Sequence, residues 1–440
     1  MLDSYSMRRV LIITYYWPPS GGSGVQRWLK MSKYLPENGW QPVIYTAEDA
    51  EYPVEDPSLE KDVAPEAEIV RRPIVEPYTF YKKLLGIKKE EKVKAGFINE
   101  GKQKSTWKEN LSVWIRGNFF IPDARCWWIK PSVRFLSKYL KKNPVDAIIS
   151  TGPPHSMHLI AKALHKKLNI PWVADFRDPW TEIFYFDSLK LSKCSLRKHK
   201  RLEKQVLTEA DKVVAVGWHE AADLENLGAK NVQVITNGFD NECVCYENNF
   251  ERNEKFTITY TGVLLPNESF VIWNALNELC GENSEFANNL KIKLIGHIDG
   301  KVKSYMAEKN LESKVENVEY MQHAQVLEYQ RKSDLLLLLV PIARKAECIL
   351  TGKLFEYIAS GRPILAVAPE NGDVARVLKE TECGFTVDFD DKEKMKSIIK
   401  DLFIKYQENQ LVTNKNDVVE KFSRRNLTKE FSKILDNLTK

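Results

Sequence analysis

The feature that most constrains the fold is an alternation of short apolar runs with helical segments, which occurs in two series along the chain. The first series has apolar runs at residues 10–13, 42–45, 147–150, 172–175, 212–216 and 232–235. The second begins with FTITYTGVL at Phe256 and continues through KIKLIGHI, VEYMQ, SDLLLLLVPI, RPILAVA and GFTVDF. Short apolar strands joined by helices are typical of parallel sheets with crossover connections. The sequence therefore predicts an α/β protein with two doubly wound, Rossmann-like domains.

A polar stretch without clear periodicity, NECVCYENNFERNEKF, separates the two series and predicts the domain boundary. We expect an N-terminal domain at residues 1–240, a linker at 241–255 and a C-terminal domain at 256–420. Residues 421–440 have apolar side chains at helical spacing, which predicts a terminal helix that packs on one domain or crosses back to the N-terminal domain. Doubly wound sheets bind ligands outside the carboxyl ends of their strands, so we expect the domains to face a shared cleft there.

The cysteines and the apolar runs exclude several classes of protein. The seven cysteines are scattered, with neither C-x-x-C pairs nor histidine partners at metal spacing, which predicts reduced thiols in a cytoplasmic protein. The N-terminal apolar run is too short for a signal sequence or a membrane span. An Asp-x-Asp at Asp388 and Asp390 precedes a helical pattern, and we interpret it as helix capping rather than as a metal site.

The net charge of +5 is unevenly distributed along the chain. Residues 81–142 hold 16 Lys and Arg against 5 Asp and Glu, interleaved with Trp107, Trp114, Phe119, Phe120, Trp127 and Trp128. Basic residues among large aromatic side chains indicate a membrane surface or an anionic ligand. A solvated helical insertion, at about residues 78–142, is an equally weighted alternative. No recognisable nucleic-acid-binding motif accompanies the segment, so we expect no nucleic-acid partner.

The loop PPSGGSGVQR follows the first apolar run and leads into a helical pattern. Gly21, Gly22 and Gly24 would let the backbone pass close to a phosphate or sugar, and Arg27 in the first helical turns can point to the same place. A tight strand-to-helix turn without a ligand is the alternative, because such glycine patterns also arise by chance.

Two further loops of the first series carry polar groups after a predicted strand. In STGPPHSMH, His155 lies at the start of a helix, where it can serve as a donor or base beside free backbone N–H groups. A buried capping histidine is the alternative. In VADFRDPW, Arg177 and Asp178 lie close to an aromatic side chain and suit a sugar-like acceptor. An ion pair of Arg177 with Asp178 or Asp175 is the competing interpretation.

The strongest signal is ILTGKLFEYIASGRPILAV, after the apolar run LLLLLVPI. Gly352 enters a helix, and Lys353 adds its charge to the helix N-terminus, so the place suits a diphosphate. Glu356 lies three residues on, on the same helical face, and can accept both hydroxyls of a ribose. A surface pair of Lys353 with Glu356 is the alternative, but it does not explain the flanking glycines.

Six motifs, PPSGGSGVQR, STGPPH, DFRDPW, VITNGFD, YTGVL and TGKLFEYIASGRPILAV, occur in this order over nearly the whole chain. With this set the chain resembles the retaining glycosyltransferases of the GT-B fold in family 4, which transfer a sugar from a nucleotide diphosphate donor. The resemblance implies an acceptor-binding N-terminal domain and a donor-binding C-terminal domain. It also implies that neither a cofactor nor a metal is required.

The resemblance carries over to particular residues. Glu356 matches the second glutamate of the family's signature of two glutamates separated by seven residues, which holds the donor ribose. The first glutamate falls at Cys348, and its neighbour Glu347 is the candidate for reaching the donor sugar. Family members often have an Arg and a Lys after the glycine that corresponds to Gly262, whereas VLLPNESFVIW has no basic residue. The candidates that would neutralise the diphosphate instead are Lys353, Arg344 and Lys345.

The predicted site has three sets of residues. The catalytic set, in which His155 contacts the donor sugar or the acceptor rather than acting as an essential base, is His155, Glu347 and Lys353. The donor-binding set is Gly22, Gly262, Gly352, Lys353 and Glu356. The acceptor-binding set is Arg27, Arg177 and Asp178.

The predicted function is transfer of a sugar, with retention, from a nucleotide diphosphate sugar to a saccharide acceptor that is lipid-linked. We expect a role in bacterial surface-polysaccharide synthesis, such as capsule or O-antigen, at the cytoplasmic face of the membrane. Two alternatives stay open. One is a GT-B sugar-nucleotide epimerase or hydrolase, which uses no acceptor, and the other is a binding protein that keeps the fold without catalysis.

Overall fold

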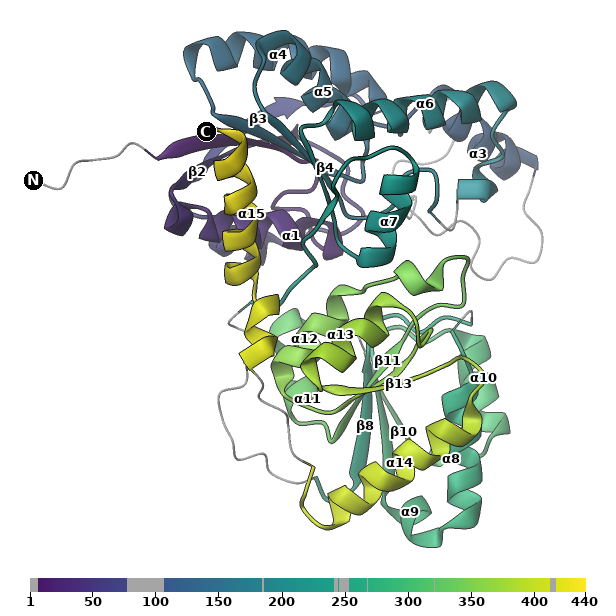
Figure 1. Ribbon diagram of the computed structural model, residues 1–440. Coiled ribbons are helices and arrows are strands. Elements are labelled where there is room, and N and C mark those ends of the chain that lie inside the picture. The colour runs from purple at the N-terminus through teal and green to yellow at the C-terminus, as the bar shows by residue number, and fades with distance from the viewer. Residues whose placement is uncertain are drawn as a thin grey trace, which may run out of the picture. The chain divides into compact units, whose positions relative to one another are not determined.

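The chain forms two compact units, each built on a parallel β-sheet (Figure 1). The computed structural model describes residues 7–76, 107–183, 186–240, 244, 253–266, 268–319, 321–411 and 417–440. Unit 1 contains residues 1–236 and 424–440, and unit 2 contains residues 237–423. Most of the predicted linker at 241–255, and residues 78–106 of the predicted insertion, lie outside the described residues.

The sheet of unit 1 has seven parallel strands in the order β3-β2-β1-β4-β5-β6-β7. The strands are β1 (Arg8–Ile13), β2 (Trp40–Glu48), β3 (Glu68–Pro73), β4 (Ala147–Gly152), β5 (Trp172–Phe176), β6 (Lys212–Ala215) and β7 (Gln233–Val234). The six apolar runs of the first series all fall on strands. The sequence did not reveal β3, because an edge strand with an exposed second half has no continuous apolar run.

Helices cover both faces of this sheet. On one face pack α4 (Ile129–Lys142), α5 (Ser156–Leu168), α6 (Lys193–Glu209) and α7 (Trp218–Asn226), with α3 (Trp107–Phe119) against α6. The other face is covered by α1 (Ser23–Tyr34) and α15 (Arg424–Leu438). Short 3-10 turns complete the unit: η1 (Pro36–Asn38), η2 (Pro57–Asp62), η3 (Cys126–Trp128) and η4 (Phe186–Leu189).

The last helix, α15, belongs to the core of unit 1, although it follows unit 2 in the sequence (Figure 1). The ring of Phe431 lies edge-on to Trp28 of α1, with 5.1 Å between the ring centroids. The Trp40 indole donates a hydrogen bond to Asp436 at 2.9 Å. Burial of this apolar stripe therefore joins the end of the chain to the first helix.

The sheet of unit 2 has six parallel strands in the order β10-β9-β8-β11-β12-β13. They are β8 (Phe256–Thr261), β9 (Leu290–Ile295), β10 (Val315–Val318), β11 (Leu335–Leu339), β12 (Ile364–Val367) and β13 (Gly384–Val387). The central strand β11 is a run of five leucines, all of them buried, as expected for a strand covered on both faces. The predicted strand VEYMQ was placed too late, since β10 ends at its first residue.

The helices of unit 2 are α8 (Val271–Glu282), α9 (Ser284–Asn289), α10 (Gly300–Glu308), α11 (His323–Arg331), α12 (Gly352–Ser360), α13 (Asp373–Thr381) and α14 (Lys392–Gln407). The 3-10 turns are η6 (Glu312–Lys314), η7 (Ala346–Cys348) and η8 (Asp417–Phe422). The Asp391 carboxylate caps α14 by accepting a hydrogen bond from the Lys394 amide. The cap is thus one residue beyond the Asp-x-Asp pair to which the sequence pointed. None of the described helices is long and apolar enough to cross a bilayer.

The strand order reverses between β1 and β4 in unit 1, and between β8 and β11 in unit 2. At such a switch point the loops after the two central strands diverge to opposite faces, which leaves a crevice at the carboxyl ends. In unit 1 these loops contain the glycines after β1 and His155 after β4. In unit 2 they contain Gly262 after β8 and the segment before α12. The prediction of two doubly wound sheets is confirmed, and it directs attention to these four loops.

Candidate functional site

The glycine loop of unit 1 is held largely by its own unit. The Gly21 amide donates to the Val54 carbonyl at 2.9 Å, and a side chain at Gly24 would press on the ring of Tyr16. Gly22 has a φ of 80° and precedes α1, with open space where a Cβ would lie. Of the three glycines, Gly22 is the one whose backbone conformation requires glycine and whose surroundings leave room for a ligand.

Arg27 does not point into that space. Its guanidinium lies 2.8 Å from a carboxylate oxygen of Asp175 and donates to the Thr236 carbonyl at 2.8 Å. Trp28 and Thr151 donate to the other oxygen of the carboxylate, and Arg27 is only 4% exposed. Burial alone would raise the pKa of Asp175, but the charge of Arg27 and these hydrogen bonds lower it. This corrects the acceptor-binding role expected for Arg27, because its side chain serves as the counter-ion of a buried carboxylate.

Arg177 joins two loops at the carboxyl edge of the unit 1 sheet. Its guanidinium donates to the carbonyl oxygens of Gly24, Gly152 and Pro153. The competing interpretation paired Arg177 with Asp178 or Asp175, but the buried carboxylate of Asp175 pairs with Arg27. Asp178, the next residue, is exposed. Arg177 therefore fixes the loops, and Asp178 remains the acidic group of this segment that solvent can reach.

His155 is the N-cap of α5 and is stacked on Trp180, with parallel rings 4.7 Å apart. Burial, together with the nearby charges of His158, Arg177 and His199, lowers the pKa of His155 well below its ordinary value. The ring is therefore neutral at neutral pH. Its Nδ1 is buried without a hydrogen-bond partner among the described residues. A neutral imidazole with an unused polar atom suits a hydrogen bond to a hydroxyl better than proton transfer.

In unit 2, Lys353 brings its ammonium group to Gly262. Nζ donates to the Tyr260 hydroxyl at 3.2 Å and to the Thr261 carbonyl at 3.0 Å. A Cβ built on Gly262, whose φ is 117°, would lie 2.7 Å from Nζ. A basic group therefore lies beside Gly262, and it comes from α12 rather than from the loop after β8. The alternatives, Arg344 and Lys345, lie in the loop before η7.

The N-terminus of α12 lies beside this lysine. Thr351 is the N-cap but makes no side-chain capping bond, and its hydroxyl is buried without a partner among the described residues. Gly352 is exposed, with no atom near the position of a Cβ. The first amides of α12 are therefore not covered by a cap, and they and the Lys353 ammonium form a place for anionic oxygens.

Glu356 lies one turn further along α12 and is bound to a histidine that the sequence did not suggest. His323, the first residue of α11, has its Nε2 3.0 Å from a carboxylate oxygen of Glu356. Glu356 keeps 21% of its side chain exposed and His323 keeps 55%. This pair follows β10 and β11, so it lies at the same edge of the sheet as Gly262. The alternative interpretation, a surface pair of Lys353 with Glu356, is not what the structure has, since the two side chains make separate sets of contacts.

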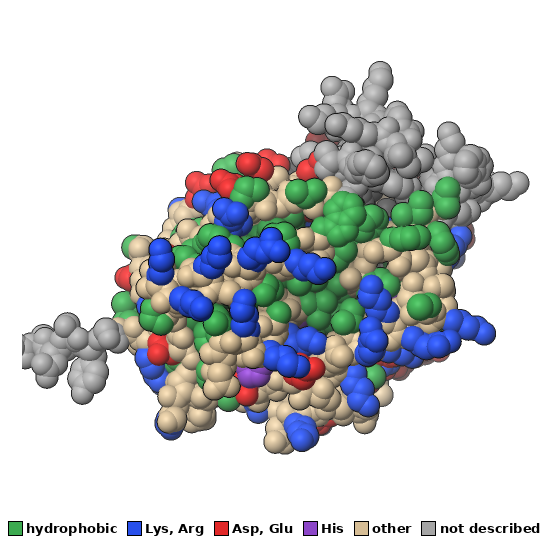
Figure 2. Space-filling view, turned by 90° about the horizontal axis from the view of Figure 1, so that it is seen from above, with side chains coloured by type: hydrophobic (Ala, Val, Ile, Leu, Met, Phe, Trp, Pro, Cys, Tyr) green, Lys and Arg blue, Asp and Glu red, His purple; other side chains and the backbone are tan. Residues whose placement is uncertain are grey.

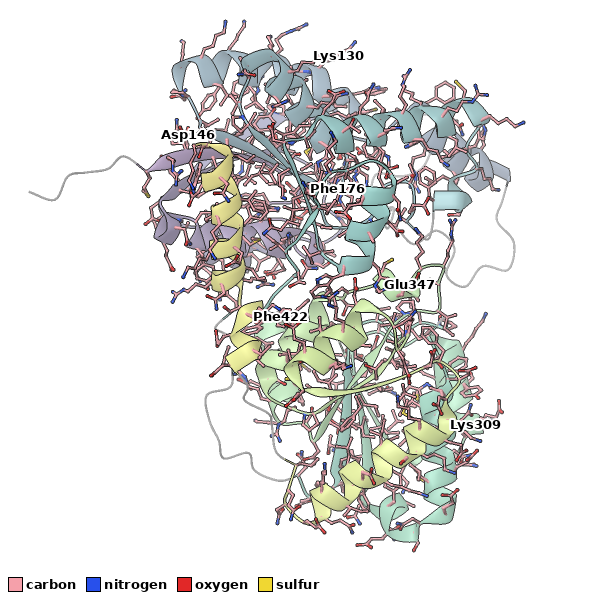
Figure 3. All side chains as sticks on the ribbon, in the orientation of Figure 1. Lys130, Asp146, Phe176, Lys309, Glu347 and Phe422 are labelled. Atoms are coloured by element: carbon pink, nitrogen blue, oxygen red, sulfur yellow. The ribbon has the colours of Figure 1, made fainter. Side chains whose placement is uncertain are left out.

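Glu347 lies in η7, at the carboxyl edge of the unit 2 sheet (Figure 3). A Cβ at Gly372 would be 3.1 Å from the Glu347 Cα, so this turn packs closely on the segment before α13. Both Glu347 and Cys348 are half-buried. The structure thus puts Glu347 on the same sheet edge as Gly262, Gly352, Lys353 and Glu356.

Sequence reasoning missed Glu268, which is 6% exposed and follows β8. The Tyr260 hydroxyl, which binds Lys353, lies 3.4 Å from one of its carboxyl oxygens. Burial raises the pKa of Glu268 to about 7, although the charge of Lys353 opposes this shift. The sequence did contain a signal for this residue. Glu268 is the acidic residue of VLLPNESF, the segment in which related proteins often have basic residues.

A separate groove of about 490 Å³ opens at the other end of the unit 2 strands. It is lined by the starts of β8, β9 and β10 and by side chains that include Lys255, Lys291, Lys293 and Glu316. Doubly wound sheets bind ligands at the carboxyl edge, so this groove is not the candidate site. Within the described residues, no group of three or more His, Cys, Asp or Glu is arranged to hold a metal.

Comparison with known proteins places this geometry in a broad fold group. Residues 99–242, less than half of the chain, match the family described as Glycosyltransferase Family 4. Among curated proteins, none matches the sequence. The matched segment includes the unit 1 loops with His155, Arg177 and Asp178.

Three solved structures cover nearly the whole chain at low sequence identity. Sucrose-phosphate synthase from Thermosynechococcus elongatus is 14% identical, with 98% of this chain and 99% of that chain covered and a TM-score of 0.63. HepE from Anabaena, solved with UDP-glucose, is 12% identical, with 98% and 100% covered and a TM-score of 0.58. A putative UDP-N-acetylglucosamine 2-epimerase from Listeria monocytogenes is 9% identical, with 97% and 95% covered and a TM-score of 0.51.

These likenesses, which are all below 25% identity, show the fold and leave the reaction open. Two strand orders that reverse at their centres, together with matches over both units, are the features of GT-B proteins. The chain thus has the GT-B fold, and its residues 99–242 match Glycosyltransferase Family 4.

Proposed function

We propose that the protein is a glycosyltransferase that moves a sugar from a nucleotide diphosphate sugar to a saccharide acceptor, with retention and without a metal. Unit 2 binds the donor and unit 1 binds the acceptor. The reaction is one step in the synthesis of a bacterial surface polysaccharide, and the acceptor is lipid-linked. The family match to residues 99–242 and the likeness to HepE, which was solved with UDP-glucose, support this proposal.

The observation that carries the proposal is the position of the Lys353 ammonium, against Gly262 and beside an N-terminus of α12 that has no side-chain cap. A diphosphate needs positive charge and several N–H donors, and this place has both. Glu356 is close enough along the same helix to accept the hydroxyls of a ribose. When the glycosidic bond breaks, charge develops on the leaving diphosphate, and the same groups stabilise it in the transition state.

Unit 1 offers groups suited to an acceptor or donor sugar. His155 has an unused Nδ1, and Asp178 is an exposed carboxylate held on a loop that Arg177 fixes. Neutral imidazoles and carboxylates both form hydrogen bonds with sugar hydroxyls. We assign these two residues to sugar recognition and keep Arg27 and Arg177 as structural residues.

The test is a thermal-shift screen of the full chain with UDP, GDP, ADP and CMP, followed by turnover assays with the matching nucleotide sugars and lipid-linked acceptors. Stabilisation by one nucleoside diphosphate, and transfer that requires an acceptor, are expected. Conversion of the nucleotide sugar without an acceptor would instead favour the epimerase or hydrolase. The Listeria protein, a putative epimerase, has a similar fold. Absence of any nucleotide binding would favour a non-catalytic GT-B protein.

We further propose that unit 1 binds the anionic cytoplasmic face of the membrane. Helix α4 exposes five basic side chains and contains no acidic residue; they are Lys130, Arg134, Lys138, Lys141 and Lys142. Helix α6 adds Lys193, Arg197, Lys198, Lys200, Arg201 and Lys204, all exposed. Beside them Phe119 is 66% exposed, Trp127 49% and Trp114 41%. Figure 2 looks onto this face and shows Lys and Arg side chains next to a hydrophobic group, and Figure 3 labels Lys130 at the start of α4.

Basic side chains contribute roughly 1 kcal/mol each near an anionic bilayer, and exposed aromatic rings enter its interfacial layer. Replacement of Lys130, Arg134 and Lys138 by Glu should abolish sedimentation with vesicles that contain phosphatidylglycerol. A control that replaces Lys301 and Lys303 of α10 by Glu should still sediment. Equal binding of both variants would contradict the membrane role, and it would leave the proposed sugar transfer untouched.

A further inference from the structure

Glu268 is a buried acid with few hydrogen-bond donors for a carboxylate: the Tyr260 hydroxyl and the Leu265 backbone amide, both of which lower its pKa. Its Oε2 atom has no partner among the described residues. Its Oε1 atom lies 3.4 Å from the Tyr260 hydroxyl, but that hydroxyl has a closer acceptor in the Val263 carbonyl at 2.8 Å. A buried carboxylate normally accepts several hydrogen bonds, because its desolvation is costly. The protonated acid, which carries one hydrogen of its own, fits this environment better.

The charged and titratable groups around Glu268 come from two elements. Tyr260 of β8 contributes its hydroxyl. Helix α12 contributes the Lys353 ammonium and the Tyr357 hydroxyl, which accepts a hydrogen bond from the Thr261 amide. Burial lowers the pKa of Lys353, and the negative charges of Glu268 and Glu356 oppose this shift. Lys353 is therefore the cation that favours the ionised form of Glu268. An anion that pairs with the Lys353 ammonium would therefore make the ionised form of Glu268 less favourable.

A bound diphosphate would do so. It would place two negative charges at the N-terminus of α12, against the Lys353 ammonium, and these charges disfavour a second anion nearby. We propose that Glu268 takes up one proton from solvent when a nucleotide diphosphate sugar binds at Lys353. This inference rests on the proposed donor site, and it adds a proton-linked residue, Glu268, to that site as a positioning group for Lys353.

The proton balance has a measurable consequence. The diphosphate of a nucleotide sugar is a diester that does not titrate near neutral pH, so any proton taken up on binding comes to the protein. Because burial raises the pKa of Glu268 to about 7, the acid is already protonated below that pH and ionised above it. Donor affinity should then fall by up to about tenfold per pH unit above about pH 7 and level off below it.

The experiment is calorimetric titration of the full chain with UDP-glucose, GDP-mannose and ADP-glucose in phosphate, PIPES and Tris at about pH 7.5. The slope of the binding enthalpy against the ionisation enthalpy of the buffer gives the number of protons taken up. Uptake of about half to three quarters of a proton is expected for the wild type, because an acid of pKa about 7 is about three quarters ionised at this pH. Uptake close to zero is expected for Glu268→Gln, which preserves size and one hydrogen-bond acceptor. His323→Gln removes the histidine that pairs with Glu356 at the same sheet edge and should keep the uptake.

A second measurement needs no ligand. An acid whose pKa is raised on folding stabilises the protein below its unfolded pKa, and this contribution is lost as the pH rises through the folded value. The melting temperature of the wild type should therefore fall relative to that of Glu268→Gln between about pH 5 and pH 8. Parallel melting profiles would overturn the proposal whether or not a donor is known.

The failures are distinguishable. If a nucleotide sugar binds and no proton is taken up, the inference about Glu268 is wrong and the donor site stands. If none of the three nucleotide sugars binds the wild type, the donor site and this inference both fail. If Glu268→Gln takes up the same proton as the wild type, another group carries the linkage and Glu268 does not.

Discussion

Two basic residues near the starts of helices, Arg27 in unit 1 and Lys353 in unit 2, look alike in the sequence and differ in the structure. Each follows a glycine that comes after a strand, and each was expected to meet a ligand. Arg27 is buried against a carboxylate that it, Trp28 and Thr151 all bind. Lys353 has two neutral oxygens as acceptors, and the acid near it is poorly satisfied. A completed ion pair holds a fold together, whereas an incomplete one leaves charge for a ligand.

The largest effect that would test this comparison is on stability. Arg27→Met should lower the free energy of unfolding by about 3–5 kcal/mol, because Asp175 would remain buried without its counter-ion. The measurement is urea unfolding followed by circular dichroism. Arg425→Met is the matched control, since Arg425 pairs with Glu37 at the surface and should cost at most about 1 kcal/mol. If the two variants were equally stable, Arg27 would not be a structural counter-ion and its predicted role in ligand binding would stand.

The next effect is on binding. Lys353→Met should weaken nucleoside diphosphate binding by about 10–100-fold, as expected for the loss of about 1.5–3 kcal/mol of charge-assisted hydrogen bonds. Its melting temperature should change less than that of Arg27→Met, because the buried acid near Lys353, Glu268, has a raised pKa and can become neutral, whereas Asp175 has a lowered pKa and stays charged. Lys309→Met, on the side of unit 2 covered by α10, should bind like the wild type. A large loss of stability in Lys353→Met would break the comparison.

A smaller effect separates the two parts of the donor. Glu356→Gln should weaken ribonucleotide binding by about 1 kcal/mol, roughly fivefold, because one charged acceptor of the ribose hydroxyls is lost. The same change should leave the binding of 2′,3′-dideoxynucleotides unaltered. If both kinds of nucleotide lose affinity equally, the role of Glu356 is to hold α11 through His323 rather than to bind ribose.

The smallest effect concerns pH, and it has opposite signs in the two units. Burial lowers the pKa of His158 in unit 1 to about 3, so the unfolded chain binds a proton at higher pH than the folded one. This costs unit 1 about 1 kcal/mol near pH 6, and the loss grows as the pH falls below the ordinary histidine value of about 6.5. His158→Gln should remove the loss in melting experiments. Glu268 acts in the other direction, since its stabilising contribution disappears as the pH rises.

Much of the fold follows from the sequence by itself. The runs of apolar residues in two series predicted two parallel sheets, since a segment such as LLLLL is typical of a strand buried on both faces. The edge strand β3 was not predicted because its first half is only half-buried and its second half is exposed. Lys353 and Glu356 could also be predicted from a local pattern, because both lie in a helix that begins at a glycine after an apolar strand.

The pairing of charges was decided only by the tertiary structure. The sequence put Arg177 next to Asp178 and Lys353 near Glu356, yet the chain brings Asp175 to Arg27 and Glu356 to His323, over separations of 148 and 33 residues. Glu268 was overlooked because nothing in VLLPNESF shows that Tyr260 and Lys353 converge on it. Periodicity is a local property that a sequence displays, whereas the partner of a buried charge depends on strand order, which brings distant loops to one edge of a sheet.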